Sequence, residues 1–307
     1  MPAPAILIIK LGALGNVILS LNAFAAIRAH HRDARISLLT TVPYAEWLRQ
    51  TPWFDEVLID TRPRWWNVPE LRRLRRMLTG PGFSRVYDLQ TSGRSSYYFQ
   101  LFPRTAKPEW SGIAPGCSHP DRDPNRDRLH DNDRQIGQLR QAGIHDIPPV
   151  DLSWCRGDIG RFGLPDDFVV LVPGSAPHRP VKRWPAAHYQ ALAEALRAQG
   201  LTAVVVGSAA EAAIARAIPA ALNLTGQTSF GDLADLGRAA RFAIGNDTGP
   251  MHLLAAAGCR SVVLFSRDSD PALCAPRGPD VRVLRRPALA SLTVATVLAE
   301  LPHLVTA

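Results

Sequence analysis

The residues best suited to chemistry lie between positions 243 and 258, in the stretch AIGNDTGPMHLLAAAG. Its apolar start predicts the end of a buried strand, and the polar run from Asn246 to Thr248 predicts a tight turn and a helix N-cap. Pro250 suits the first helical turn, where its missing N–H leaves no hydrogen bond unmade, and Gly258 suits the end of the helix. A helix that begins at the carboxyl end of a parallel strand directs free N–H groups and a positive dipole end into a crevice. The stretch therefore predicts a phosphate or pyrophosphate site, with His252 able to touch that group or to pack in the core.

Two further loops also follow predicted strands. Ser175 lies in a run of small residues, and Lys182 and Arg183 follow it just before a helix. Cations in this place fit a diphosphate, whose charge grows as a nucleoside diphosphate departs, whereas a solvated basic turn is the alternative. Glu211 comes just after another strand, where a carboxylate can accept hydrogen bonds from ribose hydroxyls or simply stabilise the helix dipole.

The N-terminal loop KLGALGN is the fourth candidate, and it begins at Lys10. Gly12 and Gly15 let the backbone approach a ligand, and the helix that follows can hold an anion; a plain turn is the alternative. The run is not a G-x-G-x-x-G fingerprint and no acidic residue follows at the ribose position, which disfavours a nicotinamide-dependent enzyme.

These loops need a scaffold that presents strand ends, and strands and helices do alternate along the whole chain. The first series predicts strands at residues 5–9, 36–40, 57–59 and 85–89 and helices at residues 17–29, 44–49, 69–78, 95–102 and 132–142. The second series predicts strands at residues 168–172, 202–206, 222–224, 242–244 and 261–265 and helices at residues 185–199, 209–218, 230–239, 251–257 and 292–301. Residues 112–133 have no period and predict a long surface loop, and residues 147–167 predict a linker.

This alternation predicts an α/β protein with parallel sheets covered by helices on both faces. We expect two doubly wound, Rossmann-like domains, residues 1–150 and 151–307, which face each other across a cleft. In such sheets ligands bind outside the carboxyl ends of the strands, so the four candidate loops would line that cleft.

Taken together, the loops resemble those of glycosyltransferase family 9, the ADP-heptose:lipopolysaccharide heptosyltransferases. The resemblance covers nearly the whole chain and is carried by the segments IIKLGALG (8–15), YDLQ (87–90), KRWP (182–185) and GNDTGPMHL (245–253). Residues 266–271 also look like the family's loop that ends in Thr-Asp-Pro. The resemblance implies a GT-B fold and an inverting, metal-independent transfer of heptose from an ADP-sugar to a lipopolysaccharide core. No cofactor is expected beside this nucleotide-sugar substrate.

The resemblance also implies roles for individual residues. The C-terminal domain would hold the donor, with Lys182 on the phosphates and Glu211 on the ribose. The residues implied for the donor site are Ser175, Lys182, Arg183, Glu211, Asp247, Thr248, Gly249 and His252. The acceptor, an anionic glycolipid with a Kdo- or heptose-containing core, would lie against the N-terminal domain and its loop of Lys10, Gly12 and Gly15.

One position departs from the family pattern. The family's first loop usually ends in Gly-Asp-Val, and its Asp is the proposed base, but here the sequence is Gly15-Asn16-Val17. An amide has no useful basicity, so Asn16 can only position a hydroxyl. Asp88 at a strand end is an alternative base, a slow reaction carried by leaving-group stabilisation is a second option, and binding without turnover is a third. We favour an active transferase.

Composition indicates the kind of partner. The net charge of +8 and the pI of about 9.8 favour anionic partners, although an arginine-rich composition from a GC-rich genome explains part of the excess. One basic cluster surrounds two tryptophans and suits an anionic membrane surface; a solvated helix face with buried tryptophans is the alternative. The cluster consists of Arg62, Arg64, Trp65, Trp66, Arg72, Arg73, Arg75 and Arg76. No nucleic-acid-binding module is recognised, so nucleic acid is not an expected partner.

The cellular location and the absence of a metal site are predicted from apolar segments and from the spacing of cysteines and acidic residues. No signal peptide and no spanning apolar segment are present, and the four cysteines have no metal-type spacing, so we expect a cytoplasmic protein with thiols and no zinc. A peripheral contact with the inner face of the inner membrane would fit the basic cluster. The triplets Asp131-Asn132-Asp133 and Asp268-Ser269-Asp270 have a D-x-D form that is common by chance, and no metal is assigned to them.

Overall fold

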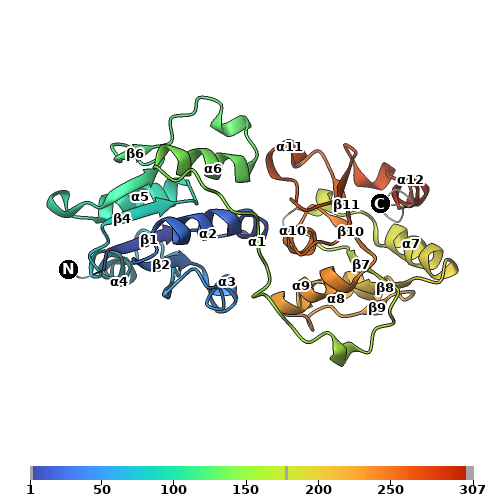
Figure 1. Ribbon diagram of the computed structural model, residues 1–307. Helices are drawn as coiled ribbons and strands as arrows, with labels where there is room; N and C mark the ends of the chain where they lie inside the picture. Colours follow the sequence, from blue (N-terminus) through green and yellow to red (C-terminus); the bar gives the residue numbers. More distant parts are fainter. Residues whose placement is uncertain (1–2, 177–178, 302–307) are drawn as a thin grey trace. The chain divides into compact units, whose positions relative to one another are not determined.

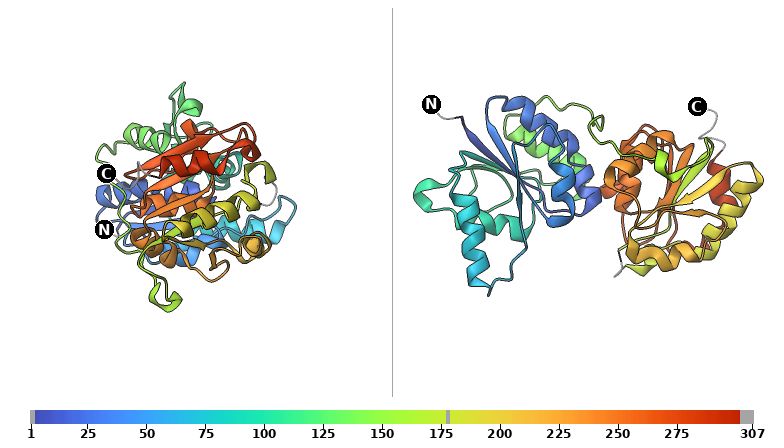
Figure 2. Two further views of the ribbon diagram at one scale, coloured as in Figure 1. Left: turned by 90° about the vertical axis from the view of Figure 1, so that its right-hand side faces the viewer. Right: turned by 90° about the horizontal axis from the view of Figure 1, so that it is seen from below.

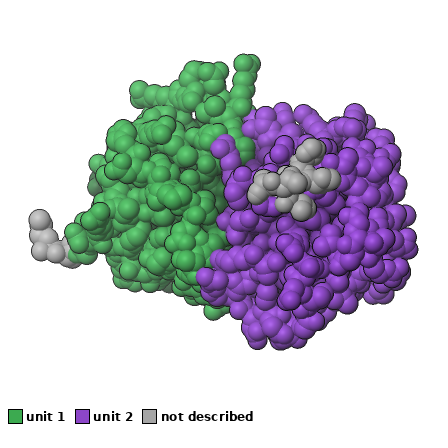
Figure 3. All heavy atoms as spheres, turned by 45° about the vertical axis from the view of Figure 1, so that its right-hand side comes forward, with its two compact units in different colours: residues 1–154 green, residues 155–307 purple. Residues whose placement is uncertain are grey.

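The computed structural model describes residues 3–176 and 179–301. The chain divides into two compact units, residues 1–154 and residues 155–307, so the division comes four residues after the expected boundary (Figures 1 and 3). Figure 2 shows that each unit consists of one sheet with helices on both of its faces.

Unit 1 contains a six-stranded sheet in the order β3-β2-β1-β4-β5-β6, and every pair in it is parallel. Its strands are β1 (Ala5–Ile9), β2 (Arg35–Thr40), β3 (Glu56–Ile59), β4 (Arg85–Asp88), β5 (Glu109–Gly112) and β6 (His119–Pro120). Its helices are α1 (Leu14–Ile18), α2 (Leu21–His30), α3 (Val42–Leu48), α4 (Val68–Thr79), α5 (Gly93–Leu101) and α6 (Asp131–Gln141). The central strand β1 pairs Ile8 with Leu38 on one side and with Tyr87 on the other. Because β1 is apolar throughout and buried on both faces, the loop that follows it lies at the centre of the carboxyl edge.

Unit 2 repeats this plan with a parallel sheet in the order β12-β11-β10-β7-β8-β9. Its strands are β7 (Phe168–Val172), β8 (Thr202–Val205), β9 (Leu222–Asn223), β10 (Phe242–Asn246), β11 (Ser261–Phe265) and β12 (Val281–Arg285). Its helices are α7 (Ala186–Ala198), α8 (Ala212–Arg216), α9 (Phe230–Ala239), α10 (Gly249–Ala256), α11 (Pro271–Cys274) and α12 (Val294–Glu300). Alternate residues of β7 and β10, such as Val169 and Ile244, pack into one apolar core with α7 and α12.

Short 3₁₀ turns connect several of these elements. They lie at Arg104–Ala106, Arg126–Arg128, Gly160–Phe162, Pro180–Lys182, Ala209–Glu211 and Leu289–Ser291. The turn at Pro180–Lys182 leads into α7 and the turn at Ala209–Glu211 leads into α8, so both belong to the candidate donor loops.

Several expected elements need correction. The helix expected at 17–29 is two helices, because Leu19 ends α1 and the Ser20 hydroxyl bonds the carbonyl of Asn16. The segment 112–133, expected to be irregular, contributes β6 to the sheet edge and includes the start of α6. The expected helix at 292–301 is shorter, because Thr293 caps α12 through the N–H of Thr296.

The strands β5 and β12 and the short helix α11 were not expected. The two strands have only four or five residues, with one and three apolar side chains, which give too little periodicity to stand out; they form by pairing with β4 and β11. The helix α11 has four residues, which is too short for a helical period to show. No helix within residues 3–176 and 179–301 is long and apolar enough to cross a membrane.

Candidate active site

The carboxyl edge of the unit 2 sheet is organised around Asn246, the fully buried last residue of β10. Its Oδ1 accepts hydrogen bonds from the N–H of Trp184 at 3.0 Å and from the hydroxyl of Tyr189 at 3.2 Å. Its Nδ2 donates to the carbonyls of Pro173 at 2.8 Å and Gly174 at 3.2 Å. One amide therefore ties the loop after β7 to the start of α7. The sequence predicted only a turn residue here, and the signal that was missed is an amide directly after a buried apolar run.

Asp247 comes next and orients the basic loop. Its Oδ2 accepts hydrogen bonds from the Lys182 ammonium at 2.5 Å and from the Ser269 hydroxyl at 2.6 Å. The side chains of Lys182 and Asp247 are 12% and 7% exposed, so this charge-assisted contact is held mostly out of water. Three loops, after β7, β10 and β11, thus converge on one carboxylate. From the sequence, Ser269 was the middle of an acidic triplet and part of the family-like loop 266–271, with no role of its own.

The other predicted cation, Arg183, is fixed by Ser175. The Arg183 guanidinium donates to the Ser175 hydroxyl at 3.1 Å and to the Ser175 carbonyl at 3.2 Å. The Ser175 hydroxyl itself donates to the carbonyl of Arg179. The small-residue run and the basic block therefore form one loop whose guanidinium has a set direction.

Glu211 is brought against the same loop. A Cβ atom on Gly174 would lie 1.5 Å from Oε1 of Glu211, so only a glycine leaves room for this carboxylate. Its Oε2 accepts hydrogen bonds from the N–H of Ser208 at 2.7 Å and from the Ser208 hydroxyl at 3.1 Å. Glu211 therefore completes a capping box and presents Oε1 to Gly174 at the same time. The helix-stabilising role expected from the sequence is confirmed by this capping box, and the ribose role of Glu211 stays a prediction.

Helix α10 begins directly beside Asp247. Thr248 is its N-cap and has no side-chain cap bond, Gly249 and Pro250 open the first turn, and His252 is buried. Gly245 allows β10 and α10 to approach, because a Cβ atom there would lie 2.7 Å from the Sδ atom of Met251 on α10. The N-terminus of an eight-residue helix thus opens at the carboxyl edge of the sheet.

In unit 1, the predicted loop residue Lys10 is buried. Its ammonium donates to the carbonyl of Leu89 at 3.0 Å and lies 3.7 Å from Oδ2 of Asp131. Burial lowers the pKa of Lys10 below its usual value, while the charges of Asp131 and Asp88 act in the opposite direction. Lys10 thus joins β1, β4 and α6 from inside the unit.

Asp88 lies at the end of β4 with its side chain fully buried. Its Oδ1 accepts hydrogen bonds from the N–H groups of Gln90 at 3.2 Å and Thr91 at 3.0 Å. Burial raises the pKa of Asp88 to about 6, and those N–H groups, the nearby Ser95 hydroxyl and the Lys10 charge only partly oppose this. Contact of this carboxylate with an acceptor hydroxyl would require unit 1 to open locally.

Packing fixes the backbone conformation of the glycine-containing loop that follows β1. Gly12 has φ of +116°, and a Cβ atom there would lie 2.6 Å from the ring of Tyr44. Gly15 is buried inside α1, and Asn16 on the same helix is half-buried. Within the described residues no group bonds the Asn16 amide, so this side chain is available for a ligand.

A cavity of about 390 Å³ lies beside this loop at the ends of β1, β2 and β3. The Arg62 guanidinium donates to the carbonyl of Leu11 at 2.9 Å, and the Arg62 N–H donates to Asp60 at 2.7 Å. The cavity is lined by Leu11, Ala13, Thr41, Val42, Pro43, Tyr44, Asp60, Thr61 and Arg62. Tyr44 and Asp60 were not predicted as site residues, although Asp60 directly follows a predicted strand.

Both acidic triplets have protein partners. Asp131 bonds Arg134 and Gln135, and Asp270 caps α11 through the N–H of Ala272. Within the part of the chain that the structure describes, no three His, Cys, Asp or Glu side chains gather as metal ligands, and no disulfide links the four cysteines.

The structure therefore brings the predicted donor residues together on unit 2, and it places Lys10, Gly12, Gly15, Asn16 and Asp88 at the carboxyl edge of the unit 1 sheet. Each unit offers polar groups at the edge where ligands bind in parallel sheets.

Known proteins are similar to this chain in sequence and in fold. A sequence profile described as glycosyltransferase family 9 (heptosyltransferase) matches residues 140–296, just over half of the chain. Lipopolysaccharide heptosyltransferase 2 of Escherichia coli (strain K12) is 26% identical over 315 residues, which cover 91% of this chain and 87% of that protein. Lipooligosaccharide heptosyltransferase 2 of Haemophilus influenzae is 33% identical over 127 residues, and this match spans 38% of the chain and 36% of that relative.

The solved structure of Escherichia coli ADP-heptose lps heptosyltransferase II is similar over 98% of both chains, with a TM-score of 0.77 and 22% identity. Two parallel six-stranded sheets confirm the expected α/β fold class of GT-B type. The chain therefore belongs to glycosyltransferase family 9, the heptosyltransferase family, and is a glycosyltransferase.

Proposed function

We propose that this protein transfers a heptose from ADP-heptose to the core of a lipopolysaccharide, with inversion at the anomeric carbon and without a metal ion. The observation that carries this proposal is the Lys182–Asp247–Ser269 contact at the N-terminus of α10. A fixed ammonium beside free helix N–H groups suits the diphosphate of a nucleotide sugar. The names of the relatives, which are heptosyltransferases acting on lipopolysaccharide or lipooligosaccharide, support the choice of sugar and acceptor.

On the donor side, Lys182 and the first turn of α10 would hold the diphosphate, and Arg183 would face it from the same loop. These groups would neutralise the charge that develops on ADP, a task that a metal ion performs in other transferases. Glu211 would accept hydrogen bonds from the ribose through Oε1, because Oε2 is already used by Ser208. Thr248 would offer its hydroxyl to the sugar diphosphate.

On the acceptor side, the cavity beside the glycine loop would receive the sugar that bears the reacting hydroxyl. Arg62, whose guanidinium lines this cavity, would pair with a carboxylate or phosphate of the acceptor core. Asn16 would hold the reacting hydroxyl by a hydrogen bond.

In the chemical step, the acceptor oxygen forms a bond to the anomeric carbon while the bond from that carbon to the diphosphate breaks. ADP takes the electron pair of the broken bond, and the hydroxyl proton leaves late, to water, because Asn16 cannot accept it. Stabilisation of the leaving group then supplies most of the catalysis. Because the acceptor is a glycolipid, the reaction would take place at the inner face of the inner membrane, with the protein as a peripheral, cytoplasmic partner.

The test is transfer by the purified protein, with ADP-heptose and a delipidated Kdo-containing core acceptor, followed by mass spectrometry. We expect a product one heptose heavier, and a loss in kcat/KM on the order of 10² for Lys182→Ala, comparable with removal of a charge-stabilising donor. Arg197→Ala, an exposed arginine in the last turn of α7, is the matched control and should leave the rate unchanged.

The outcomes separate the competing functions. Binding of ADP-heptose without any product would favour the alternative of a non-catalytic, nucleotide-sugar-binding homologue. Absence of both binding and transfer would contradict the donor assignment, and other nucleotide sugars would then replace ADP-heptose.

A further inference from the structure

The connection from β3 into α4 exposes two indoles in succession. Trp66 is 73% exposed and Trp65 is 46% exposed, so neither tryptophan lies in the core and the buried alternative raised from the sequence is wrong. Trp65 is held by Arg94, whose guanidinium lies 4.6 Å from the indole centroid, and by the ring of Tyr97 at 4.6 Å. Trp66 contacts the Arg64 guanidinium at 5.3 Å and projects further into solvent. Large apolar side chains held outward in this way indicate an interaction surface.

Helix α4 extends this surface with a row of outward residues. Leu74 and Leu78 are its buried side chains and anchor it to the core of unit 1. Val68, Arg72 and Arg76 are spaced by four residues, so they form one row along the helix, away from the buried side. Val68 is 47% exposed, and both arginines are exposed. We call Trp65, Trp66, Val68, Arg72 and Arg76 the basic–aromatic face.

Positive charge is concentrated around this face. Residues 61–79 contain six arginines and one acidic residue, Glu70, which leaves a net charge of +5 out of +8 for the whole chain. Among the residues that the structure describes, none of these six arginines forms an ion pair with a carboxylate. Arginines elsewhere in the chain, such as Arg28, Arg126 and Arg238, do form such pairs. The charge near α4 is therefore left for an external anion.

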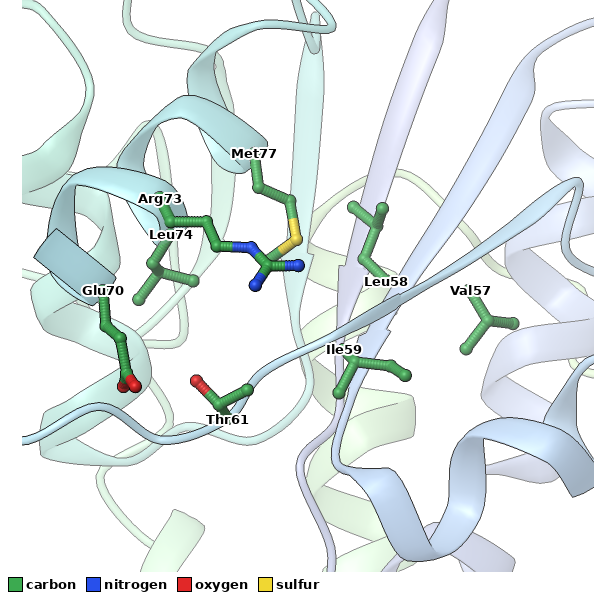
Figure 4. Close-up of a pocket in the computed structure, with 8 residues that line it drawn as sticks. All are labelled: Val57, Leu58, Ile59, Thr61, Glu70, Arg73, Leu74 and Met77. Carbon is green, nitrogen blue, oxygen red and sulfur yellow. The ribbon is translucent and has the colours of Figure 1, made fainter.

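The inner side of α4 borders a groove of about 410 Å³ along the edge strand β3, and both apolar and polar side chains line it (Figure 4). The apolar side chains of Leu74 and Met77 line it from the helix and those of Leu58 and Ile59 from the strand, and the polar side chains of Thr61 and Glu70 line it as well. The Arg73 guanidinium reaches across the same groove. A groove that combines apolar side chains with an acidic and a cationic one suits an amphipathic molecule more than the polyanionic backbone of a nucleic acid.

We propose that the basic–aromatic face docks unit 1 on the surface of an anionic phospholipid bilayer. Indoles and Val68 enter the boundary between headgroups and acyl chains, while Arg72 and Arg76 contact lipid phosphates. This inference deepens the proposed function, since it names the surface that brings the transferase to a lipid-linked acceptor. Nucleic acid is the competing partner, but the outward Val68 and the acidic Glu70 in the groove favour lipid over a polyanionic backbone.

The experiment is co-sedimentation of the full chain with vesicles of phosphatidylcholine alone and of phosphatidylcholine with one quarter phosphatidylglycerol. We expect binding to the anionic vesicles at least tenfold stronger than to the neutral ones, weakening with salt. Each arginine near an anionic surface strengthens binding by roughly fivefold, so Arg72→Glu/Arg76→Glu should weaken it at least tenfold. The matched control is Arg197→Glu/Arg216→Glu, two exposed arginines of unit 2, which makes the same change in net charge.

A second pair of variants tests the apolar part. Trp66→Ser should weaken vesicle binding several-fold, whereas Leu222→Ser, which removes a 45% exposed side chain of β9 in unit 2, should not. Circular dichroism of each variant confirms that the protein is folded. Equal losses for the α4 pair and the unit 2 pair, or no preference for anionic vesicles, would overturn the inference.

Two further readouts separate the inference from its alternatives. Binding of duplex DNA that is stronger than vesicle binding, and that Arg72→Glu/Arg76→Glu abolishes, would overturn it in favour of a nucleic-acid surface. Transfer to a delipidated acceptor should be unchanged in Arg72→Glu/Arg76→Glu, since these residues lie outside the donor and acceptor sites. Vesicle binding without any transfer would contradict the proposed function and leave the docking surface supported.

Discussion

The Lys182 ammonium and the Asp247 carboxylate lie 2.5 Å apart although 64 residues separate them in the chain. The Ser269 hydroxyl shares the same oxygen, so three loops of one sheet edge meet at this point. A lysine that is fixed by a carboxylate loses little conformational entropy when it contacts a phosphate, which makes the loop a prepared site for a diphosphate.

Replacement of Asp247 tests this relationship. Asp247→Asn keeps the shape but removes the charge that orients Lys182, so we expect donor KM to rise about tenfold with a smaller change in kcat. Steady-state kinetics at saturating acceptor measures both constants. Ser269→Ala removes one hydrogen bond from an uncharged donor and leaves the carboxylate on Lys182, so it should change KM less than threefold. Equal effects of the two variants would contradict the orienting role of Asp247.

Gly174→Ala tests the place of Glu211. The added methyl group would overlap Oε1 of Glu211, so the carboxylate must turn away from the loop after β7. We expect ADP binding, measured by calorimetry, to weaken by about five- to tenfold through the loss of one ribose contact. Gly137→Ala is the control, because its Cβ atom would meet nothing within 4 Å and alanine favours the helix α6. Unchanged ADP affinity in Gly174→Ala would contradict the ribose role of Glu211.

Asn16→Asp tests the missing base. A carboxylate at this half-buried, unbonded position would accept the acceptor proton, and a general base contributes roughly 10²–10⁴-fold in rate. We expect kcat of transfer to rise at least tenfold and Asn16→Ala to lower it. A slower Asn16→Asp protein would show that the amide is the better group here and that proton removal does not limit the rate.

The pH dependence of stability tests the buried Asp88. Its pKa rises from 3.8 unfolded to about 6 folded, so the folded state holds the proton more tightly. The protonated carboxyl therefore contributes to the free energy of unfolding below pH 4. That contribution, about 3 kcal/mol, is lost as the pH rises through about 6. We expect Asp88→Asn to be more stable than the parent protein in urea unfolding at pH 8, with less gain at pH 4.

An exposed carboxylate provides the comparison for this prediction. Asp166 lies on the surface of unit 2, so Asp166→Asn should leave the urea midpoint of unfolding unchanged at both values of pH. A pH-independent difference between Asp88→Asn and the parent protein would show that the carboxylate is ionised without cost in the folded state.

Local patterns predicted much of this protein because they reflect local physics. The strands β1, β7 and β11 match their predicted bounds, since strands buried on both faces favour continuous apolar runs, which are complete in β1 and β7 and follow Ser261 in β11. The start of α10 was also predicted correctly, because Thr248 and Pro250 have local preferences for the N-cap and the first turn of a helix. Short elements such as β5 and β6 were missed, because their hydrogen bonds to neighbouring strands, rather than their own composition, hold them.

The sequence by itself determined the α/β alternation, the family and the loops that carry polar residues at strand ends. Only the tertiary structure decided what those residues do. Asn246 organises two loops and Lys10 is buried, whereas Lys182 meets Asp247 and Trp66 faces solvent. The physical reason is that burial and hydrogen-bond partners come from segments distant in the chain, and no local pattern encodes which of them will meet.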